Sequence, residues 1–99
     1  MKMAWSASMK VRVRVSLLLR KYTDGREVIE VGGSTPLECL RALEARFPAI
    51  KRRLYDKWGD LLPQLQLFIN GERVLPGELN NFPLQDGDEL LVLVAVGGG

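Results

Sequence analysis

Three consecutive glycines close the sequence, and they are the residues on which a specific chemistry is most readily placed. Gly97, Gly98 and Gly99 follow an uncharged apolar run over residues 90–96 and end on a backbone carboxylate. Packing alone does not call for glycine here, because glycine loses more backbone freedom on ordering than any other residue. We therefore expect the carboxylate of Gly99 to be the reactive group. The alternative is a frayed end or a remnant of cloning, in which the glycines have no role.

Residue types that support other chemistries are scarce in the sequence. It contains no histidine, which excludes imidazole catalysis and the common histidine-containing zinc sites. Its single cysteine, Cys39, has neither a second cysteine nor a histidine beside it, so we expect it to be structural. Neither a Gly-x-x-x-x-Gly-Lys loop nor a dinucleotide-binding fingerprint is present. We expect no bound metal or cofactor, and a protein that is a substrate of other enzymes rather than an enzyme.

The composition indicates one globular domain. The 99 residues, 46% of them hydrophobic and 26% charged, suffice for a single core without metal or disulfide support. A net charge of +2 does not by itself predict nucleic-acid binding, and no run reaches the ~20 apolar residues of a membrane span. Lys10, Arg12 and Arg14 interrupt the first apolar stretch, which argues against a signal peptide. We expect a cytoplasmic protein with neither a nucleic-acid nor a membrane partner.

Three regions of different character divide the chain. Residues 1–8 have no periodicity and are expected to form a flexible extension, residues 9–96 the domain, and residues 97–99 an exposed tail. Strict alternation over residues 10–17 predicts a half-buried strand, with Leu17 on the inner face. The cations on its outer face fit either an anion-binding stripe or a solvated surface, and the lack of interleaved aromatic side chains favours the solvated surface.

The remaining strands are bounded by turn residues. A turn at residues 23–25 and a returning strand at 26–31 predict a hairpin. Residues 64–69 and 72–75 flank Asn70-Gly71, a strong two-residue hairpin motif. Asp86-Gly87 then begins the final strand at residues 90–96. Trp58, in the loop before residue 64, is expected to cover an edge of the core.

One main helix is predicted between the second and third strands. Thr35 as N-cap, Pro36 at the first helical position and Glu38 completing a capping box mark its start. Pro48 ends it. Its expected core face comprises Leu37, Leu40, Leu43 and Phe47. A further helical piece at residues 49–55 should turn Ile50 and Leu54 inward and leave three cations, Lys51, Arg52 and Arg53, on the surface.

This order of elements predicts an α+β roll: a mixed sheet of about four to five strands with one main helix packed across it, as in the β-grasp fold of ubiquitin. The first and last strands should lie side by side at its centre. Both faces of the last strand are apolar. We expect one face to pack on the helix and the other, with Leu91, Leu93 and Ala95, to bind a partner. Val96, the residue before the glycines, is expected to contact the same partner. Coverage of Leu91 and Leu93 by Leu19, Leu67 or residues 1–8 is the alternative.

Three segments of the sequence resemble a known family: Leu67-Phe-Ile-Asn-Gly71, Leu84-Gln-Asp-Gly-Asp-Glu-Leu90 and Ala95-Val-Gly-Gly-Gly99. On these segments, residues 9–99 resemble the family of molybdopterin synthase small subunits and thiamine sulfur carriers. That family usually ends in Pro-Val-Ala-Gly-Gly, so Ala95 replaces a proline and Gly97 a small residue. Residues 47–55 resemble the molybdopterin and ubiquitin-like-modifier branch more than the shorter thiamine carriers.

The resemblance implies that Gly99 is modified by other proteins. A ubiquitin-activating-type adenylyltransferase would use ATP to form an acyl-adenylate on Gly99, and persulfide sulfur would convert it to a thiocarboxylate. A cysteine desulfurase or a rhodanese-like protein would supply that sulfur. Gly97 and Gly98 would give the tail access to a narrow active site, since they have no Cβ atom. The large subunit of molybdopterin synthase would receive the sulfur.

Three other functions stay open from the sequence. The first is a ubiquitin-like modifier joined to lysines through Gly99. The second is a sulfur carrier for thiamine, cysteine or tRNA thiolation. The third, from a different class, is a β-grasp binding module whose glycines are incidental.

Overall fold

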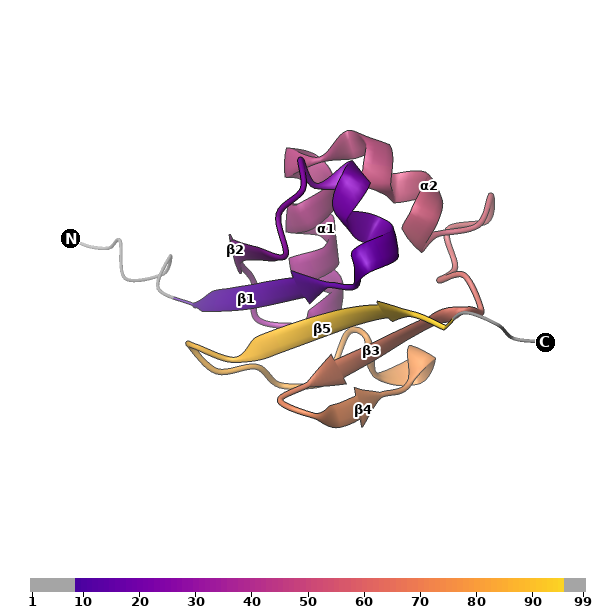
Figure 1. Cartoon of the computed structure of the whole chain (residues 1–99). Helices are drawn as coiled ribbons and strands as arrows, with labels where there is room; N and C mark the ends of the chain where they lie inside the picture. Colours follow the sequence, from indigo (N-terminus) through magenta and orange to yellow (C-terminus); the bar gives the residue numbers. More distant parts are fainter. Residues whose placement is uncertain (1–8, 96–99) are drawn as a thin grey trace.

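The first and last strands lie side by side at the centre of the structure, a computed structural model that describes residues 9–95 (Figure 1). They are β1 (Lys10–Val15) and β5 (Glu89–Val94), which pair in parallel. The sheet has five strands in the order β2-β1-β5-β3-β4 and is mixed, because every other pairing is antiparallel. The other three strands are β2 (Val28–Gly32), β3 (Leu65–Ile69) and β4 (Glu72–Val74), of which β2 and β4 form the edges. The predicted α+β sheet with its first and last strands adjacent is therefore confirmed.

The core lies between one face of this sheet and the helices that cover it (Figure 1). Residues that face each other across paired strands share a face, so Val13, Leu90 and Ile69 all point to the core side. The core is aliphatic, and its largest fully buried side chains include Ile29, Leu40, Leu43, Ile50, Leu54, Leu67 and Leu90. The other face of the sheet has no helix over it in Figure 1.

Helix α1 (Pro36–Arg46) begins where the sequence predicted, and its cap differs in one detail. Thr35 Oγ1 accepts a hydrogen bond from Glu38 N at 3.2 Å. The Glu38 carboxylate bonds to Ser34 rather than to Thr35, accepting from the Ser34 backbone N–H at 2.8 Å and from its hydroxyl at 2.9 Å. The buried residues of α1 are Pro36, Cys39, Leu40 and Leu43. Leu37 and Phe47, also predicted to face the core, are only half-buried.

The connection between β1 and β2 is longer than the tight hairpin turn that the sequence predicted. β1 ends at Val15, and residues Leu17–Tyr22 form a 3-10 helix, η2. Leu17 is 73% exposed rather than inward, whereas Leu19 is buried. Three consecutive leucines cannot all face one side of a strand, and the tighter helix turns one of them to the core. The turn at residues 23–25 exists, with Asp24 at φ 55° and Gly25 at φ 79°, but it ends η2 instead of joining two strands.

The second half of the chain follows the predicted order. The 3-10 turn η3 (Pro48–Ile50) leads into the short helix α2 (Lys51–Leu54), and Ile50 and Leu54 are fully buried as expected. Asn70 (φ 49°) and Gly71 (φ 88°) form the two-residue turn between β3 and β4. A 3-10 turn, η4 (Pro76–Glu78), begins the connection to β5. The prediction for Trp58 was wrong: it is 75% exposed and covers no core edge.

Candidate functional site

Strand β5, which leads toward the terminal glycines, is held on both sides up to its last described residue. Val94 N donates to the Ser16 hydroxyl at 3.3 Å, and Ala95 N donates to the Gln64 carbonyl at 2.8 Å. Four of the predicted site residues, Val96, Gly97, Gly98 and Gly99, lie outside the described residues. Their roles stay predictions, but the segment that presents them is a paired central strand.

The two faces of β5 have different surroundings. Leu90 and Val92 are fully buried, whereas Leu91 and Leu93 are half-buried on the opposite face and Ala95 is exposed. Leu19 and Leu67, which the alternative placed over Leu91 and Leu93, are buried in the core instead. Neither therefore covers the outer face of β5. Partner binding by Leu91, Leu93 and Ala95 stays a prediction.

An apolar strip runs along this uncovered face. Phe68 of β3 lies opposite Leu91 in the pairing register, and Leu93 follows on the same face. A hollow of about 410 Å³ opens here, lined by Phe68, Asn70, Gly71, Glu89, Leu91 and Leu93. We call Phe68, Leu91 and Leu93 the sheet strip. Burying two leucines of the strip against a partner would contribute ~3–6 kcal/mol before the cost of association.

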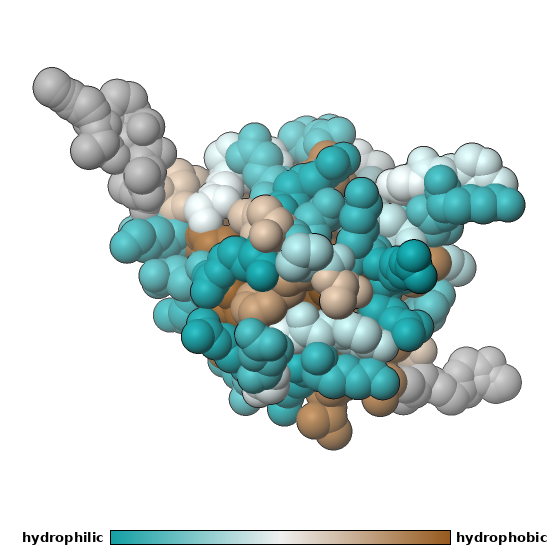
Figure 2. Space-filling model, turned by 90° about the horizontal axis from the view of Figure 1, so that it is seen from above, coloured by the Kyte–Doolittle hydropathy of each residue, from teal (hydrophilic) through white to brown (hydrophobic). Residues whose placement is uncertain are grey.

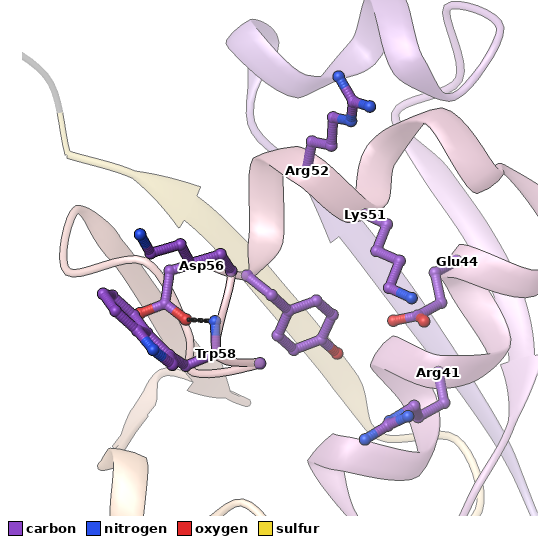
Figure 3. Close-up of a pocket in the computed structure, with 9 residues that line it drawn as sticks. Arg41, Glu44, Lys51, Arg52, Asp56 and Trp58 are labelled. Atoms are coloured by element: carbon purple, nitrogen blue, oxygen red, sulfur yellow. Dashed lines mark hydrogen bonds between the residues drawn. The ribbon is translucent and has the colours of Figure 1, made fainter.

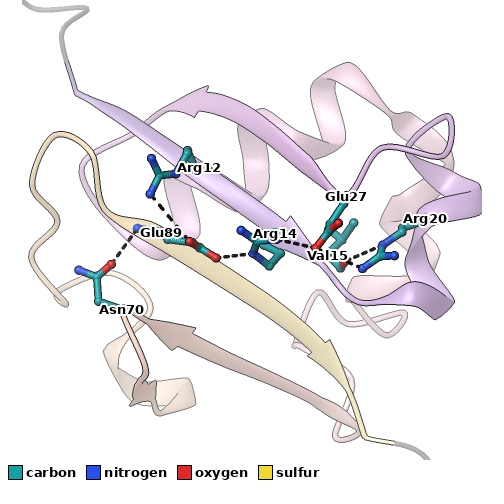
Figure 4. Close-up of polar contacts among 7 residues, drawn as sticks. All are labelled: Arg12, Arg14, Val15, Arg20, Glu27, Asn70 and Glu89. Carbon is teal, nitrogen blue, oxygen red and sulfur yellow. Dashed lines mark hydrogen bonds and ion pairs between the residues drawn. The ribbon is translucent and has the colours of Figure 1, made fainter.

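A network of ion pairs borders the sheet strip (Figure 4). Arg14 bonds to both Glu89 and Glu27, and these two carboxylates raise the pKa of its guanidinium, Glu89 contributing most. Arg12 lies 3.9 Å from Glu89, and Arg20 lies 3.6 Å from Glu27. The arginines of β1 therefore already have anionic partners within the protein. This arrangement favours the solvated surface over the anion-binding stripe.

The Asn-Gly and Asp-Gly-Asp-Glu segments have a structural role. The Asn70 side chain accepts from Glu89 N at 3.0 Å (Figure 4). It also donates to the Asp88 carboxylate at 3.0 Å. Asp88 also accepts from Gln85 N at 2.8 Å. These bonds connect the β3–β4 turn to the turn before β5. They fix the position of the turn from which the strand leading toward the tail begins.

A second apolar surface lies close to where β5 ends. Leu17 and Leu18 are 73% and 53% exposed on η2. Leu18 lines a hollow of about 270 Å³ together with Leu19, Leu62 and Val94, with Lys21, Tyr22, Arg53 and Gln64 completing the wall. The prediction of a strand over residues 10–17 placed Leu17 inward and so did not anticipate this surface. The run of three leucines, too apolar for one face of a strand, was the feature that could have indicated it.

The structural role expected for Cys39 agrees with its surroundings. Its side chain is fully buried, and burial together with the charge of Glu38 raises the pKa of the thiol to about 11. A thiol with that pKa is protonated at neutral pH and is a poor nucleophile. Cys39 therefore packs the core beneath Gly33, where an added Cβ atom would lie 2.9 Å from its sulfur.

Within residues 9–95, no three carboxylate or thiol side chains come together as metal ligands would. None of the helices formed by those residues is long and apolar enough to cross a membrane.

A five-stranded mixed sheet with its last strand at the centre and helices across one face defines a ubiquitin-like β-grasp protein. The chain belongs to the ThiS family, whose model matches residues 13–99. It is thereby a member of the ubiquitin-like fold family of small sulfur carriers and modifiers, which are generally not catalysts themselves. No curated protein sequence matches the chain.

Several solved structures are similar to this chain over nearly its whole length. Small archaeal modifier protein 1 from Methanosarcina acetivorans is 26% identical, with a TM-score of 0.80 over 92% of this chain and 97% of that one. CysO from Mycobacterium tuberculosis is 31% identical, with a TM-score of 0.76 over 87% and 99%. A chain of the Amycolatopsis orientalis BexX/CysO complex is 32% identical, with a TM-score of 0.72 over 90% and 99%. Relatives in fold thus include one solved together with a partner.

Proposed function

We propose that this protein is a sulfur carrier whose Gly99 carboxylate is adenylated and then converted to a thiocarboxylate. The observation that carries the proposal is β5, a central strand paired on both sides to Ala95 and directed into three glycines. Because β5 is paired up to Ala95, the segment that leads into the glycines is already ordered, and a partner that binds the tail does not have to order it. The half-buried Leu91 and Leu93 supply an apolar contact on the same strand.

The chemistry requires other proteins to act on the tail. A carboxylate is a poor electrophile, so an adenylyltransferase of the ubiquitin-activating type first joins it to AMP from ATP and releases pyrophosphate. The terminal sulfur of a persulfide then attacks the acyl carbon, and AMP leaves. A thiol cleaves the remaining S–S bond, forming a disulfide with the donor and freeing the thiocarboxylate. The persulfide would come from a cysteine desulfurase or a rhodanese-like protein. Gly99 has no side chain to obstruct attack on its acyl carbon.

The acceptor that we propose is the pterin precursor of molybdopterin, with this protein as the small subunit of molybdopterin synthase. Residues 47–55 resemble the molybdopterin and ubiquitin-like-modifier branch more than the shorter thiamine carriers, which supports this acceptor over thiamine. A thiocarboxylated preparation incubated with a molybdopterin synthase large subunit and the precursor should lose its sulfur to the pterin. Retention of the sulfur there, with loss to a thiamine, cysteine or tRNA acceptor, would reject this acceptor and keep the carrier function.

A protein modifier is the second candidate, favoured by the 26% identity to small archaeal modifier protein 1 over 92% of the chain. It would use the same adenylate, with a lysine amine in place of the persulfide. Mass spectrometry of proteins from the native host separates the two. Replacement of one oxygen by sulfur on the C-terminal peptide supports the carrier, whereas branched glycine remnants on lysines support the modifier. Neither product under any growth condition would support a binding module with incidental glycines.

Removal of Gly99 tests the tail directly. The deletion should abolish thiocarboxylate formation in a reaction with the adenylyltransferase, ATP and a persulfide donor. It should leave the melting temperature unchanged, because a terminal glycine contributes no side chain to packing. A matched control is the full chain made with a C-terminal amide, which keeps every residue and blocks only the carboxylate. Normal sulfur loading of the amide would refute the proposal.

A further inference from the structure

A basic groove lies on the helix side of the molecule, across the sheet from the sheet strip (Figure 3). It has a volume of about 690 Å³ and is formed by α1, α2 and the loop after α2. Four cations and two aromatic residues characterise it: Arg41, Lys51, Arg52, Lys57, Tyr55 and Trp58. Figure 2 views the molecule from the helix side, and the surface there is mostly hydrophilic. A ligand of this groove must therefore make polar contacts.

The cations of the groove differ from the arginines of β1 and η2, because they have no anionic partner within residues 9–95. Arg12, Arg14 and Arg20 all lie within 4 Å of a glutamate. No ion pair joins Arg41, Lys51, Arg52 or Lys57 to any carboxylate of residues 9–95. The only acidic residues that line the groove are Glu44 and Asp56, so its lining has a net charge of +2 from four cations and two anions. This surface attracts an anionic ligand.

Tyr55 and Glu44 lie together at the floor of the groove. The Tyr55 hydroxyl and Glu44 Oε2 are both shielded from solvent, and neither has a hydrogen-bond partner elsewhere among the described residues. Burial, with smaller contributions from the charge of Glu44 and a hydrogen bond to it, raises the pKa of Tyr55. These two groups therefore face each other, and the cations and Trp58 are the groups that the groove offers to a ligand.

Trp58 is held in an exposed position at the mouth of the groove. The Asp56 carboxylate accepts from Trp58 N at 2.9 Å and from Asp60 N at 3.0 Å, and Gly59 follows at φ 87° (Figure 3). The indole is 75% exposed, with the Lys57 ammonium 4.7 Å from its ring centroid. An exposed tryptophan on a tightly bonded turn has the character of an interface anchor.

We propose that the basic groove binds an acidic peptide segment of a second protein, leaving the sheet strip free for the partner that processes the tail. Carboxylates of the segment pair with the four cations, and an apolar side chain packs on Trp58. RNA fits less well, because a single exposed tryptophan does not provide the successive stacking platforms of a single-strand binder.

The position of the basic groove determines which proteins can be bound at the same time. The groove is built on α1 and α2, whereas the sheet strip lies on the face that no helix covers (Figure 1). Proteins bound at the two surfaces need not compete. The carrier could thus remain attached to one protein through the groove while its tail is processed by another. Binding at the groove requires no reaction at Gly99, so it can be tested independently of the proposed function.

Titration of the ¹⁵N-labelled full chain with acetyl-Asp-Glu-Phe-Glu-Asp-amide tests the proposal. Shift changes should be confined to residues 41–59, including the Trp58 indole N–H, and added salt should weaken binding. Reversal of two groove charges, K51E/R52E, should weaken binding about tenfold or more. R26E/R73E is the matched control, with the same change in net charge outside the groove, and should bind as the unaltered chain does. Equal melting temperatures would establish that both variants are folded.

Three results would overturn the proposal. They are the absence of shift changes at the groove, equal weakening by the control variant, and tighter binding of oligouridine than of the peptide at the same residues. W58A provides a second check on the contact with the apolar side chain. It should weaken this peptide and leave unchanged a peptide in which alanine replaces the phenylalanine. Equal losses for both peptides would also count against the proposed packing on Trp58.

Discussion

Neighbouring leucines of β5 should respond oppositely to truncation, because they lie on opposite faces of the sheet. Leu90 is fully buried opposite Val13 and Ile69, so Leu90→Ala leaves a cavity and should cost about 2–5 kcal/mol of unfolding free energy. Leu91 is half-buried beside Phe68, and Leu91→Ala should cost about 1 kcal/mol, roughly half of a full leucine burial. The two substitutions remove the same atoms at adjacent positions, so each serves as the control for the other.

Calorimetry measures the predicted loss of stability, and an interaction assay measures the predicted loss of partner binding. In a chain of this length, about 1 kcal/mol corresponds to a shift of about 4–8 °C in melting temperature. Leu90→Ala should therefore lower it by about 10 °C or more, and Leu91→Ala by about 5 °C. The affinity for the adenylyltransferase is measured below both melting temperatures. Leu91→Ala should weaken this binding about tenfold if ~1.4 kcal/mol of contact energy is lost. Leu90→Ala should bind with nearly unchanged affinity.

The reverse pattern would refute the assignment of faces. If Leu91→Ala destabilised the protein as much as Leu90→Ala, the outer face of β5 would be covered, as the alternative with residues 1–8 over it requires. If neither substitution affected binding while Gly99 remained reactive, the partner would recognise a surface other than the sheet strip. The exposed Leu17 and Leu18 near the end of β5 would then be the next residues to replace.

Two further predictions concern stability. Gly33→Ala should destabilise the protein by about 1–3 kcal/mol, because the new Cβ would lie 2.9 Å from Cys39 Sγ and 3.0 Å from its backbone nitrogen; Gly77→Ala, with nothing within 4 Å, is the control in urea unfolding. Hydrogen bonds from the Ser34 backbone and hydroxyl lower the pKa of Glu38. Its contribution should thus be complete above the ordinary glutamate pKa of about 4.3 and be lost as pH falls through the lower folded value. Glu38→Gln should reduce the acid-dependent fall in melting temperature between neutral and acid pH, and an unchanged fall would contradict this role.

The sequence permitted a detailed prediction of local elements wherever one residue type has a strong physical preference. Thr35 and Pro36 indicated the start of α1, and Asn70-Gly71 indicated a turn that requires positive φ at both positions. The prediction failed where periodicity was ambiguous. The alternation of apolar and polar residues in the sequence continues through Leu17, whereas in the structure β1 ends at Val15 and η2 begins at Leu17.

The candidate surfaces were less predictable than the elements. The sequence pattern of β5 predicted that one of its faces would point outward. It did not predict that Phe68 of β3 would lie beside Leu91, because that depends on the register between two strands. The ion pairs of Arg14 join residues 13 and 75 positions apart. The basic groove combines a helix, a short second helix and a turn. The sequence identified the cations Lys51 and Arg52 as a surface patch but gave no indication that Tyr55 and Glu44 would face them.

By itself, the sequence determined which segments form strands, where the main helix begins, that imidazole chemistry is impossible, and that the chain ends in three glycines. Each of these depends on the intrinsic preference or chemistry of residues close together in the chain. Within residues 9–95, the tertiary structure decided that β5 lies between β1 and β3, that Leu91 and Leu93 remain uncovered, and that four cations without an anionic partner share one groove. Those properties arise from distant residues brought together by packing, and the pattern of any one segment does not contain them.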